Sequence, residues 1–580
     1  MSARDSVVCR GRGVYLSAMR HSSSTFSTLL LALGLALGCG GSASPTDAGL
    51  DTGTADAGVD ATMDASADSG TDATVDSGLP TGDVCDAMDL PRAEWLAGTG
   101  AAYGDVAGDF TVDTLSGDPW TLSEHFSGCE SYVFLNYAAV ADGDTLWASF
   151  PDRLIANAPA NVHFFFTSYE RDAAAARTRV EAMRTNIEDA LTRVDATTAE
   201  AFRRRVHYVT TPLLDIEGSV GDRARAQSGI ALAFAIARDQ RFDPVGSLAQ
   251  VTSVGFVSRL VMAAYPGQFY NYRAALRERL AAEPTPTVVP VMAAETVTDR
   301  IFDRPITLPD AAAMAGFDTM EFDVQITCHA DARNCSEWDR IADIELCMND
   351  ACDETLELVR WITPYARPGR RRWVIDATPF LGLFVDGGAR TLKVVMGPSW
   401  EAATEREVNI DMRLFHAGTT DTSTDVQRAF TGGTFDATYN DLQLPFHFTP
   451  PAGTTRVELV VLISGHGQTA GDNCAEWCNH EHDFTITGHA PHHVSFDGQA
   501  GTAMGCAAKT SEGVVPGQYG NWAPGRAAWC PGLPVPARRI DITSDVDLTG
   551  DNELSYEGSF AGGAPRGGDI DLSAYVVSYH

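Results

Sequence analysis

The C-terminal half of the chain consists of short runs in which apolar and polar residues alternate, separated by turns rich in Gly, Pro, Asn and Asp. Examples are residues 391–396, 408–414 and 456–462. Alternation with a period of two sends side chains to opposite faces of a strand, and many short strands between turns are typical of β-sandwiches. A polar stretch at 417–428 divides the region. The sequence therefore predicts two packed sandwiches, over 294–417 and 428–580, and clefts between domains are favoured ligand sites.

Residues 85–285 combine strand-like and helical segments instead. Short apolar runs predict strands at 110–112, 131–137, 162–166, 206–209 and 231–236. Residues 171–203 are rich in Ala and Arg, which favour a helix. This mixture predicts an α/β domain. Residues 286–293 contain two prolines and a short apolar stretch, and we expect them to form the linker to the first sandwich.

Two stretches of the α/β region resemble thioredoxin-like redoxin domains. DFTVDTLSGDPWTLSEHFSGCESYVFLNY resembles the opening of that fold, and AIARDQRFDPVGSL resembles a late strand and turn. The resemblance spans residues 100–265 and departs at the redox centre, where AAVADGDTLW follows Tyr137 in place of the redox cysteines. Without a thiolate, thiol–disulfide exchange has no nucleophile. We therefore expect a redox-inactive scaffold or interaction module.

The N-terminus has the features of an export signal. Residues 26–38 form an apolar run that is short for a transmembrane helix, and LALGC at its end resembles a bacterial lipoprotein box. The resemblance implies that residues 1–38 are a lipoprotein signal peptide and that the Cys39 thiol is lipidated. Such a protein is exported and anchored at the outer membrane or cell surface. An ordinary secretory signal is the alternative, and a start at Met19 in place of Met1 gives a signal of more usual length.

Residues 39–84 are dominated by Asp, Ala, Thr, Ser and Gly. A segment of this composition buries too little apolar surface to offset the entropy lost on ordering, and its like charges repel. It is expected to be a disordered tether. The aspartates do not match the spacing of a calcium-binding loop.

The formal net charge of −35 argues against nucleic acid and anionic membrane surfaces as partners, because the Coulomb interaction is repulsive. Contact with a membrane is expected only through the lipid anchor. The chain has 12 cysteines, many in closely spaced pairs. With an export signal, such pairs favour disulfides in an oxidising compartment. Cys85 and Cys129 can pair as a structural bridge.

The segment CHADARNCSEWDR, from Cys328 to Arg340, carries chemistry in the first sandwich. Cys328 and Cys335 bracket a polar loop, and the acid Asp339 follows between Trp338 and Arg340. A carboxylate beside an indole and a guanidinium can bind a polar ligand such as a sugar. A salt-bridged loop end is the alternative.

The second sandwich has a related motif, in which Glu476 and Trp477 lie between Cys474 and Cys478. If these cysteines pair, the closed loop of five residues contributes roughly 2 kcal/mol in the loop-entropy model, so the bridge mainly shapes the backbone. A longer bridge from Cys506 to Cys530 would hold Trp522, Arg526 and Trp529 together. Cys347 and Cys352 flank a turn where a hairpin bridge is reasonable.

Five motifs carry a family resemblance over residues 295–580: ITCHADARNCSEWDRIADIEL, VRWITPYA, ISGHGQ, CAEWC and GNWAPGRAAWCPG. Their order and spacing resemble bacterial peptide:N-glycosidase F, the glycoamidase that removes N-glycans from asparagine. The resemblance implies two adjacent eight-stranded jelly-roll sandwiches, in agreement with the strand pattern. It also implies the disulfides Cys328–Cys335, Cys474–Cys478 and Cys506–Cys530, whereas Cys347–Cys352 is an addition.

The same resemblance implies roles for individual residues. Asp339 matches the principal catalytic carboxylate and Glu476 the second essential acid. Arg340 matches a substrate-binding arginine and Arg526 another arginine of the site. Two cleft tryptophans fall on Trp400 and Trp529, and Trp338 and Trp477 lie beside the acids.

The chain departs from the family pattern at two positions. A third family acid is replaced by Pro398, and only a reshaped loop lets Glu401 or Glu405 substitute for it. A cleft tryptophan is replaced by His466. These changes put glycan specificity and activity in question.

The expected reaction is hydrolysis of the amide between an asparagine side chain and the first N-acetylglucosamine of an N-glycosylated protein or peptide. Asp339 activates or positions water, and general-base assistance of this kind contributes ~10²–10⁴-fold. Glu476 orients the sugar-amide end, and the two arginines bind substrate oxygens or a developing oxyanion. No cofactor or metal is required.

Two other function classes compete with this expectation. His480-Glu481-His482 and His492-His493 form a histidine-rich patch, and two histidines on one face of a strand suit copper or zinc. A copper-dependent monooxygenase-like protein is therefore one alternative. A glycan-binding surface lipoprotein without catalysis is the other, and Pro398 favours it.

Overall fold

The computed structural model describes residues 84–248, 259–328, 338–400, 404–418, 422–467 and 474–580. The predicted signal peptide, lipidated Cys39 and nearly all of the predicted tether lie outside the described residues. Among the helices that are described, none has both the length and the apolar character needed to cross a membrane.

A five-stranded mixed sheet forms the centre of the α/β region, in the order β5-β4-β3-β6-β7. Its strands are β3 (Ser131–Tyr137), β4 (Val162–Ser168), β5 (Val206–Tyr208), β6 (Ala233–Ile236) and β7 (Phe242–Asp243). β3, β4 and β5 run parallel, whereas β6 is antiparallel to β3 and to β7. The predicted strands of this region are confirmed, and a short strand pair, β1 (Thr111–Val112) and β2 (Trp120–Thr121), precedes the sheet.

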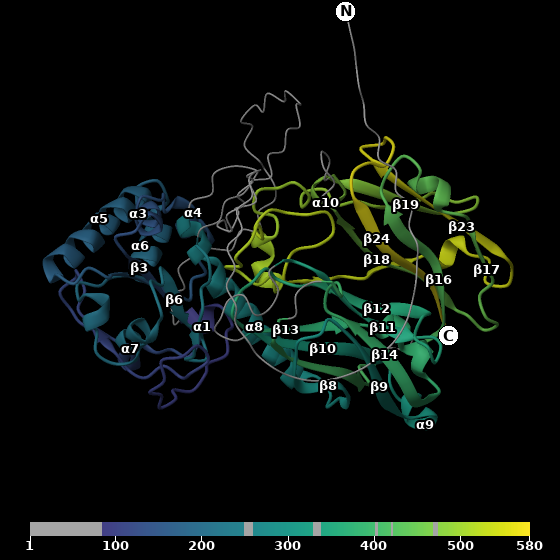
Figure 1. The fold of residues 1–580 in the computed structure, drawn as a ribbon, viewed down its shortest axis with the longest axis horizontal. Helices are drawn as coiled ribbons and strands as arrows, with labels where there is room; N and C mark the ends of the chain where they lie inside the picture. Colours follow the sequence, from purple (N-terminus) through teal and green to yellow (C-terminus); the bar gives the residue numbers. More distant parts are fainter. Residues whose placement is uncertain (1–83, 249–258, 329–337, 401–403, 419–421, 468–473) are drawn as a thin grey trace, which may run out of the picture. The chain divides into compact units, whose positions relative to one another are not determined.

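Both faces of this sheet are buried. Val133 and Leu135 pack with residues of α3 (Ala141–Trp147), α4 (Asp152–Asn157), α5 (Ala173–Leu191) and α6 (Ala196–Arg203). The alternate residues Tyr132 and Phe134 pack with β1, β2 and α7 (Ser219–Ala226). Figure 1 shows α3, α5 and α6 on one side of the sheet and α7 on the other. Successive side chains of a strand point to opposite faces, which explains the nearly continuous apolar sequence of β3.

The predicted helical stretch at 171–203 forms two helices rather than one. Asp172 caps α5 by accepting a hydrogen bond from the Ala175 amide, and Asp195 caps α6 by accepting from the amides of Thr197 and Thr198. A carboxylate that satisfies free amide groups starts a new helix, so Asp195 divides the segment. A further helix, α8 (Tyr265–Ala282), precedes the first sandwich.

The first sandwich consists of two antiparallel sheets. One has the order β13-β10-β15-β8 and the other the order β12-β11-β14-β9, with β21 added beside β12. The strands are β8 (Thr287–Val297), β9 (Ile301–Asp310), β10 (Thr319–Cys328), β11 (Ile341–Cys347), β12 (Thr355–Ile362), β13 (Gly369–Asp376), β14 (Gly387–Val395), β15 (Arg406–Phe415) and β21 (Pro534–Val535). Numbered along the chain, its eight strands have the orders 1-8-3-6 and 2-7-4-5, which are those of a jelly roll.

The second sandwich repeats these orders, as β16-β24-β18-β22 and β17-β23-β19-β20. Its strands are β16 (Ser423–Thr434), β17 (Phe446–Phe448), β18 (Arg456–His466), β19 (His480–Ile486), β20 (His492–Val494), β22 (Arg538–Asp541), β23 (Asn552–Phe560) and β24 (Asp569–Tyr579). The fold class of two adjacent jelly rolls after an α/β domain is confirmed at this level.

The predicted linker at 286–293 is wrong. Residues 287–297 form β8, which pairs along β15 at the edge of its sheet. Pro290 lacks an amide proton, and an edge strand tolerates that loss because one of its sides makes no ladder hydrogen bonds. The first sandwich therefore begins at Thr287, before the predicted boundary at 294. Likewise β16 begins at Ser423, before the predicted boundary at 428.

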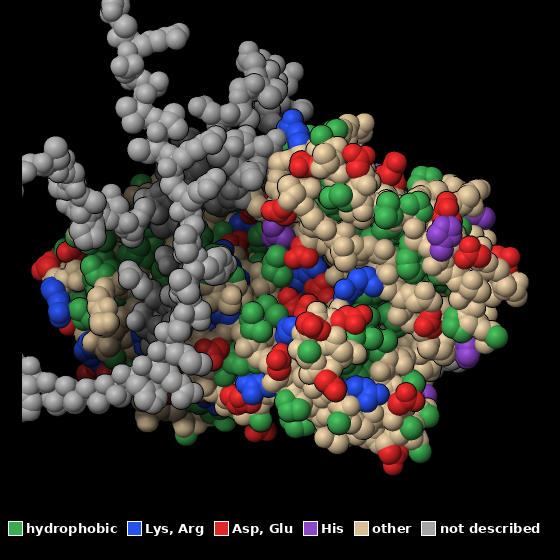
Figure 2. All heavy atoms as spheres, turned by 45° about the vertical axis from the view of Figure 1, so that its right-hand side comes forward, with side chains coloured by type: hydrophobic (Ala, Val, Ile, Leu, Met, Phe, Trp, Pro, Cys, Tyr) green, Lys and Arg blue, Asp and Glu red, His purple; other side chains and the backbone are tan. Residues whose placement is uncertain are grey.

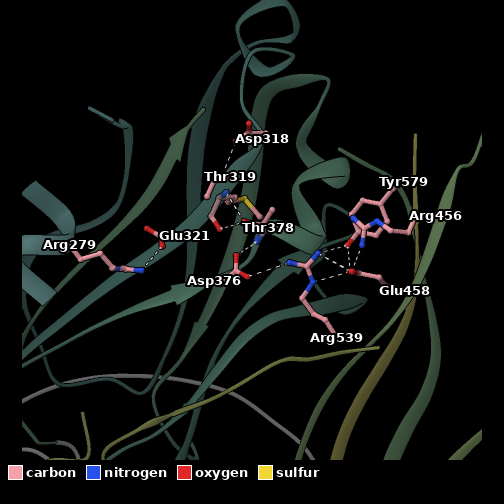
Figure 3. Close-up of polar contacts among 11 residues, drawn as sticks. Arg279, Asp318, Thr319, Glu321, Asp376, Thr378, Arg456, Glu458, Arg539 and Tyr579 are labelled. Atoms are coloured by element: carbon pink, nitrogen blue, oxygen red, sulfur yellow. Dashed lines mark hydrogen bonds and ion pairs between the residues drawn. The ribbon is translucent and has the colours of Figure 1, made fainter. Parts of the chain in front are cut away.

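The two sandwiches are joined by buried and partly buried polar groups. Arg360 of β12 donates to Ser464 Oγ of β18 at 2.8 Å and to the carbonyl of Asp571 in β24 at 2.7 Å. Arg539 of β22 lies 3.9 Å from Asp376 of β13 and 2.9 Å from Glu458 (Figure 3). On the surface, acidic side chains are spread over the visible face with basic ones among them (Figure 2).

Candidate active site

Asp339 lies two residues before β11, on a segment that is fixed by its backbone. The Arg340 amide donates to Thr363 Oγ1 at 2.8 Å, and the Thr363 amide donates back to the Arg340 carbonyl at 2.8 Å. Thr363 follows β12 directly, so the sheet of the first sandwich sets the position of Asp339.

Glu476 belongs to a single helical turn, α10 (Cys474–Trp477), which the Cys474–Cys478 disulfide closes. The carbonyl of Glu476 accepts a hydrogen bond from the Ala527 amide at 2.9 Å. The turn packs tightly against β18, because a Cβ on Gly465 would lie 1.7 Å from the Ala475 carbonyl oxygen. Only glycine permits this approach.

Arg526 brings the two acids together. Its Nε donates to Glu476 Oε1 at 2.9 Å, and its Nη2 lies 3.4 Å from Asp339 Oδ2. The same Nη2 lies within hydrogen-bond distance of the Tyr365 hydroxyl, at 3.1 Å, and donates to the Asn521 carbonyl at 2.7 Å. Arg526 is completely buried and has hydrogen bonds in several directions, so one guanidinium fixes a carboxylate from each sandwich.

Burial makes this group of charges unusual. It raises the pKa of Glu476 to about 7, with Asp339 adding to the rise and Arg526 opposing it. Burial also raises the pKa of Asp339, against the lowering effects of Arg526 and of a hydrogen bond from Tyr365. Burial lowers the pKa of Arg526, but Tyr365 and the two carboxylates outweigh it, so its pKa is raised. The guanidinium therefore stays charged, and both carboxyl groups hold protons more tightly than in water.

Two indole rings enclose the guanidinium. The Arg526 Cζ lies 4.4 Å from the ring centroid of Trp477 and 4.7 Å from that of Trp529. Trp529 donates from Nε1 to the Gly465 carbonyl at 2.6 Å and stacks on His466, with 4.8 Å between ring centroids. These rings keep water from the ion pairs, and a cation over an aromatic face is itself stabilised.

Tyr365 is a member of this site that sequence reasoning did not select. Its amide donates to the buried Gln518 at 2.9 Å, and Gln518 donates in turn to the carbonyls of Val515 and Pro531. A Cβ on Gly520 would lie 2.2 Å from the Tyr365 ring. The only sequence signal was the position of Tyr365 within the motif VRWITPYA.

Comparison with known proteins identifies relatives of the C-terminal region. Residues 434–577 match the family model described as peptide-N-glycosidase F, C terminal. The chain is 32% identical over 265 residues to the peptide-N(4)-(N-acetyl-β-D-glucosaminyl)asparagine amidase F of Elizabethkingia miricola, covering 42% of this chain and 70% of that protein. The chain belongs to the peptide-N-glycosidase F family.

Among solved structures, PNGase F from Flavobacterium meningosepticum is similar with 21% identity and a TM-score of 0.40, covering 51% of this chain and 96% of that one. The structure of PNGF-II is similar with 12% identity and a TM-score of 0.39, covering 53% of this chain and 67% of that one.

The remaining site residues predicted from the peptide-N-glycosidase F resemblance make other contacts. Trp400 is 75% exposed, and the Arg340 Cζ lies 5.1 Å from its ring centroid. Trp338 is half-exposed, with its ring centroid 6.5 Å from that of Tyr365. The structure thus places Asp339, Glu476, Arg526, Trp477, Trp529 and His466 together, and places Arg340, Trp400 and Trp338 toward the surface.

Pro398 stands where the sequence resemblance to the peptide-N-glycosidase F family led us to expect a third acid. Glu401, one proposed substitute, lies outside the described residues. Glu405, the other, is exposed and makes no hydrogen bond or ion pair with Asp339 or Arg526 in the described part of the chain.

Four disulfides are described: Cys85–Cys129, Cys347–Cys352, Cys474–Cys478 and Cys506–Cys530. These pairings are the ones that the sequence predicted. The predicted partner of Cys328, Cys335, lies outside the described residues. Arg371 donates to Cys328 Sγ at 2.6 Å.

The histidine patch divides into two parts. His480 and His482 are completely buried in the second sandwich, whereas His492 and His493 lie near its surface and contact Asp545 and Asp483. Within the described ranges, one group of three residues is close enough to share a metal: Asp303, Cys347 and Cys352. Its two cysteines form a disulfide and so offer no thiolate.

Proposed function

We propose that this protein is a glycoamidase that hydrolyses the asparagine–GlcNAc amide of N-glycoproteins or glycopeptides, releasing the glycan and leaving aspartate. Its family membership supports the activity, and the E. miricola relative is named for it. The observation that carries the proposal is the contact of Arg526 with both Glu476 and Asp339, which places two carboxylates from different sandwiches around one cation.

Asp339 is the group proposed to activate water. Its Oδ2 is buried and makes no hydrogen bond of good geometry, although Arg526 lies 3.4 Å away. That oxygen can accept a proton from a water molecule, whose oxygen then forms the new bond to the amide carbon. Asp339 next gives the proton to the amide nitrogen as the carbon–nitrogen bond breaks. The products are the peptide aspartate and a glycosylamine, which loses ammonia in water.

Glu476 and Arg526 prepare the site for this step. Glu476, as a carboxylate, accepts hydrogen bonds from the sugar-amide end of the substrate and orients it. Arg526 opposes the rise in the pKa of Asp339 and Glu476 that burial causes, and it binds the developing oxyanion. The surrounding Trp477 and Trp529 keep the charges dry, which strengthens their interactions. Arg340 and Trp400 are suited to bind sugar or peptide groups at the rim.

The test is release of glycan from a defined N-glycopeptide by the full chain, followed by mass spectrometry. The wild type is expected to convert asparagine to aspartate and release the glycan. Asp339→Asn is expected to abolish release while its thermal unfolding stays close to that of the wild type. Binding of a glycan array without any release would contradict the proposal and select the glycan-binding alternative.

The copper-dependent alternative is less well supported. His480 Nδ1 and His482 Nε2 lie 2.5 Å apart and share a hydrogen bond, and His482 Nδ1 is bonded to Tyr556. Three of the four ring nitrogens are therefore engaged with side chains.

We further propose that the α/β region, residues 85–285, is thioredoxin-like and redox-inactive. The parallel unit from β3 to β4, the antiparallel pair β6 and β7, and the helix α8 that follows support this topology. The segment after β3 forms α3 without a cysteine. We expect the protein to show no disulfide reductase activity with insulin, measured under conditions that preserve Cys85–Cys129.

Export as a lipoprotein anchored at the outer membrane or cell surface is also a proposal, with an Asp-rich tether over residues 39–84. The four described disulfides support an oxidising compartment. Metabolic labelling with a fatty acid is expected to mark the wild type and to be lost in Cys39→Ser.

A further inference from the structure

Four buried side chains form a hydrogen-bonded chain through the interior of the second sandwich. The hydroxyl groups of Tyr439 and Tyr556 lie 2.8 Å apart, and the Tyr556 hydroxyl lies 2.7 Å from His482 Nδ1. His482 Nε2 lies 2.5 Å from His480 Nδ1. All four residues are at most 2% exposed and come from three separate segments of the sandwich. No step of the proposed reaction uses them.

This series of hydrogen-bonded side chains ends at His480, beside Ala475, the residue that precedes Glu476. His480 Nε2 is buried and makes no hydrogen bond of good geometry, and both this atom and the Ala475 carbonyl oxygen lie beside Gly465. A Cβ on Gly465 would be 2.5 Å from His480 Nε2 and 1.7 Å from that oxygen. Burial lowers the pKa of His480 to about 4, and the nearby Ala475 backbone opposes this fall.

The direction of the chain follows from the protonation states. Burial lowers the pKa of His482 well below its usual value and raises that of Tyr556 well above its own, so the histidines are neutral and the tyrosines protonated near pH 7. A neutral imidazole has one donor and one acceptor. If Tyr556 donates to His482 Nδ1, His482 donates to His480 Nδ1, and His480 Nε2 keeps the proton that faces Ala475.

The opposite direction places a lone pair of His480 against the lone pairs of the Ala475 carbonyl, which is repulsive. The hydrogen bonds of the two tyrosines and two histidines therefore orient the His480 Nε2 proton toward the Ala475 carbonyl. The other backbone contacts of this turn lie elsewhere: the Ala475 amide donates to the Gly567 carbonyl at 2.7 Å, and the Glu476 carbonyl accepts from Ala527.

We propose that His480, held by His482 and Tyr556, is a positioning residue that fixes the Ala475 carbonyl and thereby holds Glu476 against Arg526. The proposal rests on the glycoamidase function proposed above. A turn of four residues has few internal hydrogen bonds, so its orientation depends on such outside contacts. Displacement of the turn would lengthen the 2.9 Å contact between Glu476 and Arg526 and admit water to the carboxylate.

Neighbouring charged and titratable groups shift the pKa values of His482 and Glu476. Besides His480, the groups that act on His482 are Arg538 and His493, and both lower its pKa. Arg526 and Asp339 act on Glu476, beside its burial. A change in the pH dependence of activity after substitution of the uncharged His480 therefore reports the altered surroundings of Glu476, not a lost charge.

The test compares His480→Leu with His480→Gln in the full chain. Leucine removes the donor and the acceptor, whereas glutamine retains an amide N–H and a carbonyl oxygen. His480→Leu is expected to lower kcat on the order of 10²-fold, the effect of a misplaced reacting group, and to change KM less. The acid limb of its pH profile is expected to move to lower pH, because hydration lowers the pKa of Glu476. His480→Gln is expected to recover most of kcat.

Phe448→Leu is the control for a merely structural role. Phe448 is buried in the same hydrophobic core, and its ring stacks on that of Phe446 rather than on His480 or His482. It is expected to lower the melting temperature while leaving kcat and the acid limb in place. An unchanged kcat and pH profile in His480→Leu would overturn the proposal. So would a loss of kcat in Phe448→Leu as large as that in His480→Leu when the two variants have the same melting temperature.

A direct measurement separates this inference from the proposed function. Isotope-edited infrared titration of the Glu476 carboxyl requires no turnover. A lower pKa of Glu476 in His480→Leu than in His480→Gln and the wild type supports the positioning role even if no glycan is released. An identical pKa in all three proteins overturns it, whatever their activity.

Discussion

Arg526 donates from Nε to Glu476 Oε1 at 2.9 Å, although the two residues are fifty positions apart in the sequence. The Ala527 amide binds the Glu476 carbonyl as well, so the segments are joined through both side chain and backbone. The Cys474–Cys478 and Cys506–Cys530 disulfides constrain the two segments separately. The second sandwich thus builds an ordered cation and anion pair, onto which the first sandwich places Asp339.

Replacement of Arg526 by lysine is expected to reduce kcat by at least ~10²-fold, because an ammonium cannot reproduce the fork of hydrogen bonds to Glu476, Tyr365 and Asn521. Thermal unfolding should also occur at a lower temperature, because two buried carboxylates lose part of their compensation. Arg538→Lys, at an exposed position, is the control and is expected to retain kcat. Equal activity of Arg526→Lys and the wild type in glycopeptide hydrolysis would contradict the role of Arg526.

The pH dependence follows from the raised pKa of Glu476. In the unfolded chain this group titrates at its ordinary pKa of about 4.5, whereas in the folded protein it titrates at about 7. Between these values the folded state binds more protons, so its free energy of unfolding falls as the pH rises through this window. Asp339, whose pKa is also raised, contributes with the same sign.

Activity is expected to rise with pH where the free energy of unfolding falls, because the proposed mechanism uses the Glu476 carboxylate. We expect kcat to rise with pH through a midpoint near 7, measured by glycan release in buffers of constant ionic strength. In Glu476→Gln the decline in stability across this window should be smaller, as measured by thermal unfolding at several pH values. If stability declines with pH in Glu476→Gln as it does in the wild type, other groups cause the decline.

The two short disulfides offer a matched comparison. Each closes a small loop, with sequence separations of 4 for Cys474–Cys478 and 5 for Cys347–Cys352, so removal of either should cost about 2 kcal/mol in the loop-entropy model. Replacement of Cys474 and Cys478 by alanine is expected to reduce kcat strongly, because Glu476 lies inside that loop. Replacement of Cys347 and Cys352 should leave kcat near the wild-type value. The same loss of kcat in both double variants would show that stability alone is responsible.

Gly520→Ala tests the support of Tyr365. The added Cβ would lie 2.2 Å from the ring, so the ring or the loop must move, and such overpacking costs about 1–3 kcal/mol. We expect a lower melting temperature together with a reduced kcat. Gly433→Ala is the control, because a Cβ there meets no atom within 4 Å and its φ is negative. A neutral effect of Gly520→Ala on both measurements would show that Tyr365 is not held by this contact.

Much of the site was predictable because its residues lie within long motifs. Asp339 and Glu476 were each found beside a tryptophan and a cysteine pair, and Arg526 within the loop that Cys506 and Cys530 close. The alternating pattern predicted the strands for the same reason that it forms them, since one face of each must be buried. The predicted linker failed because prolines alone do not distinguish a loop from an edge strand, as Pro290 in β8 shows.

The sequence by itself indicated the two acids and the arginine as candidates, the four described cysteine pairs and the repeated sandwich pattern, because each is expressed in local residue order. Only the tertiary structure decided that Arg526 lies between Glu476 and Asp339, that Tyr365 joins them, and that Trp400 lies at the surface. It also turned the histidines of the HEH motif inward, toward Tyr556. Contacts and burial of this kind depend on how distant strands pack, and burial in turn sets the pKa of Glu476.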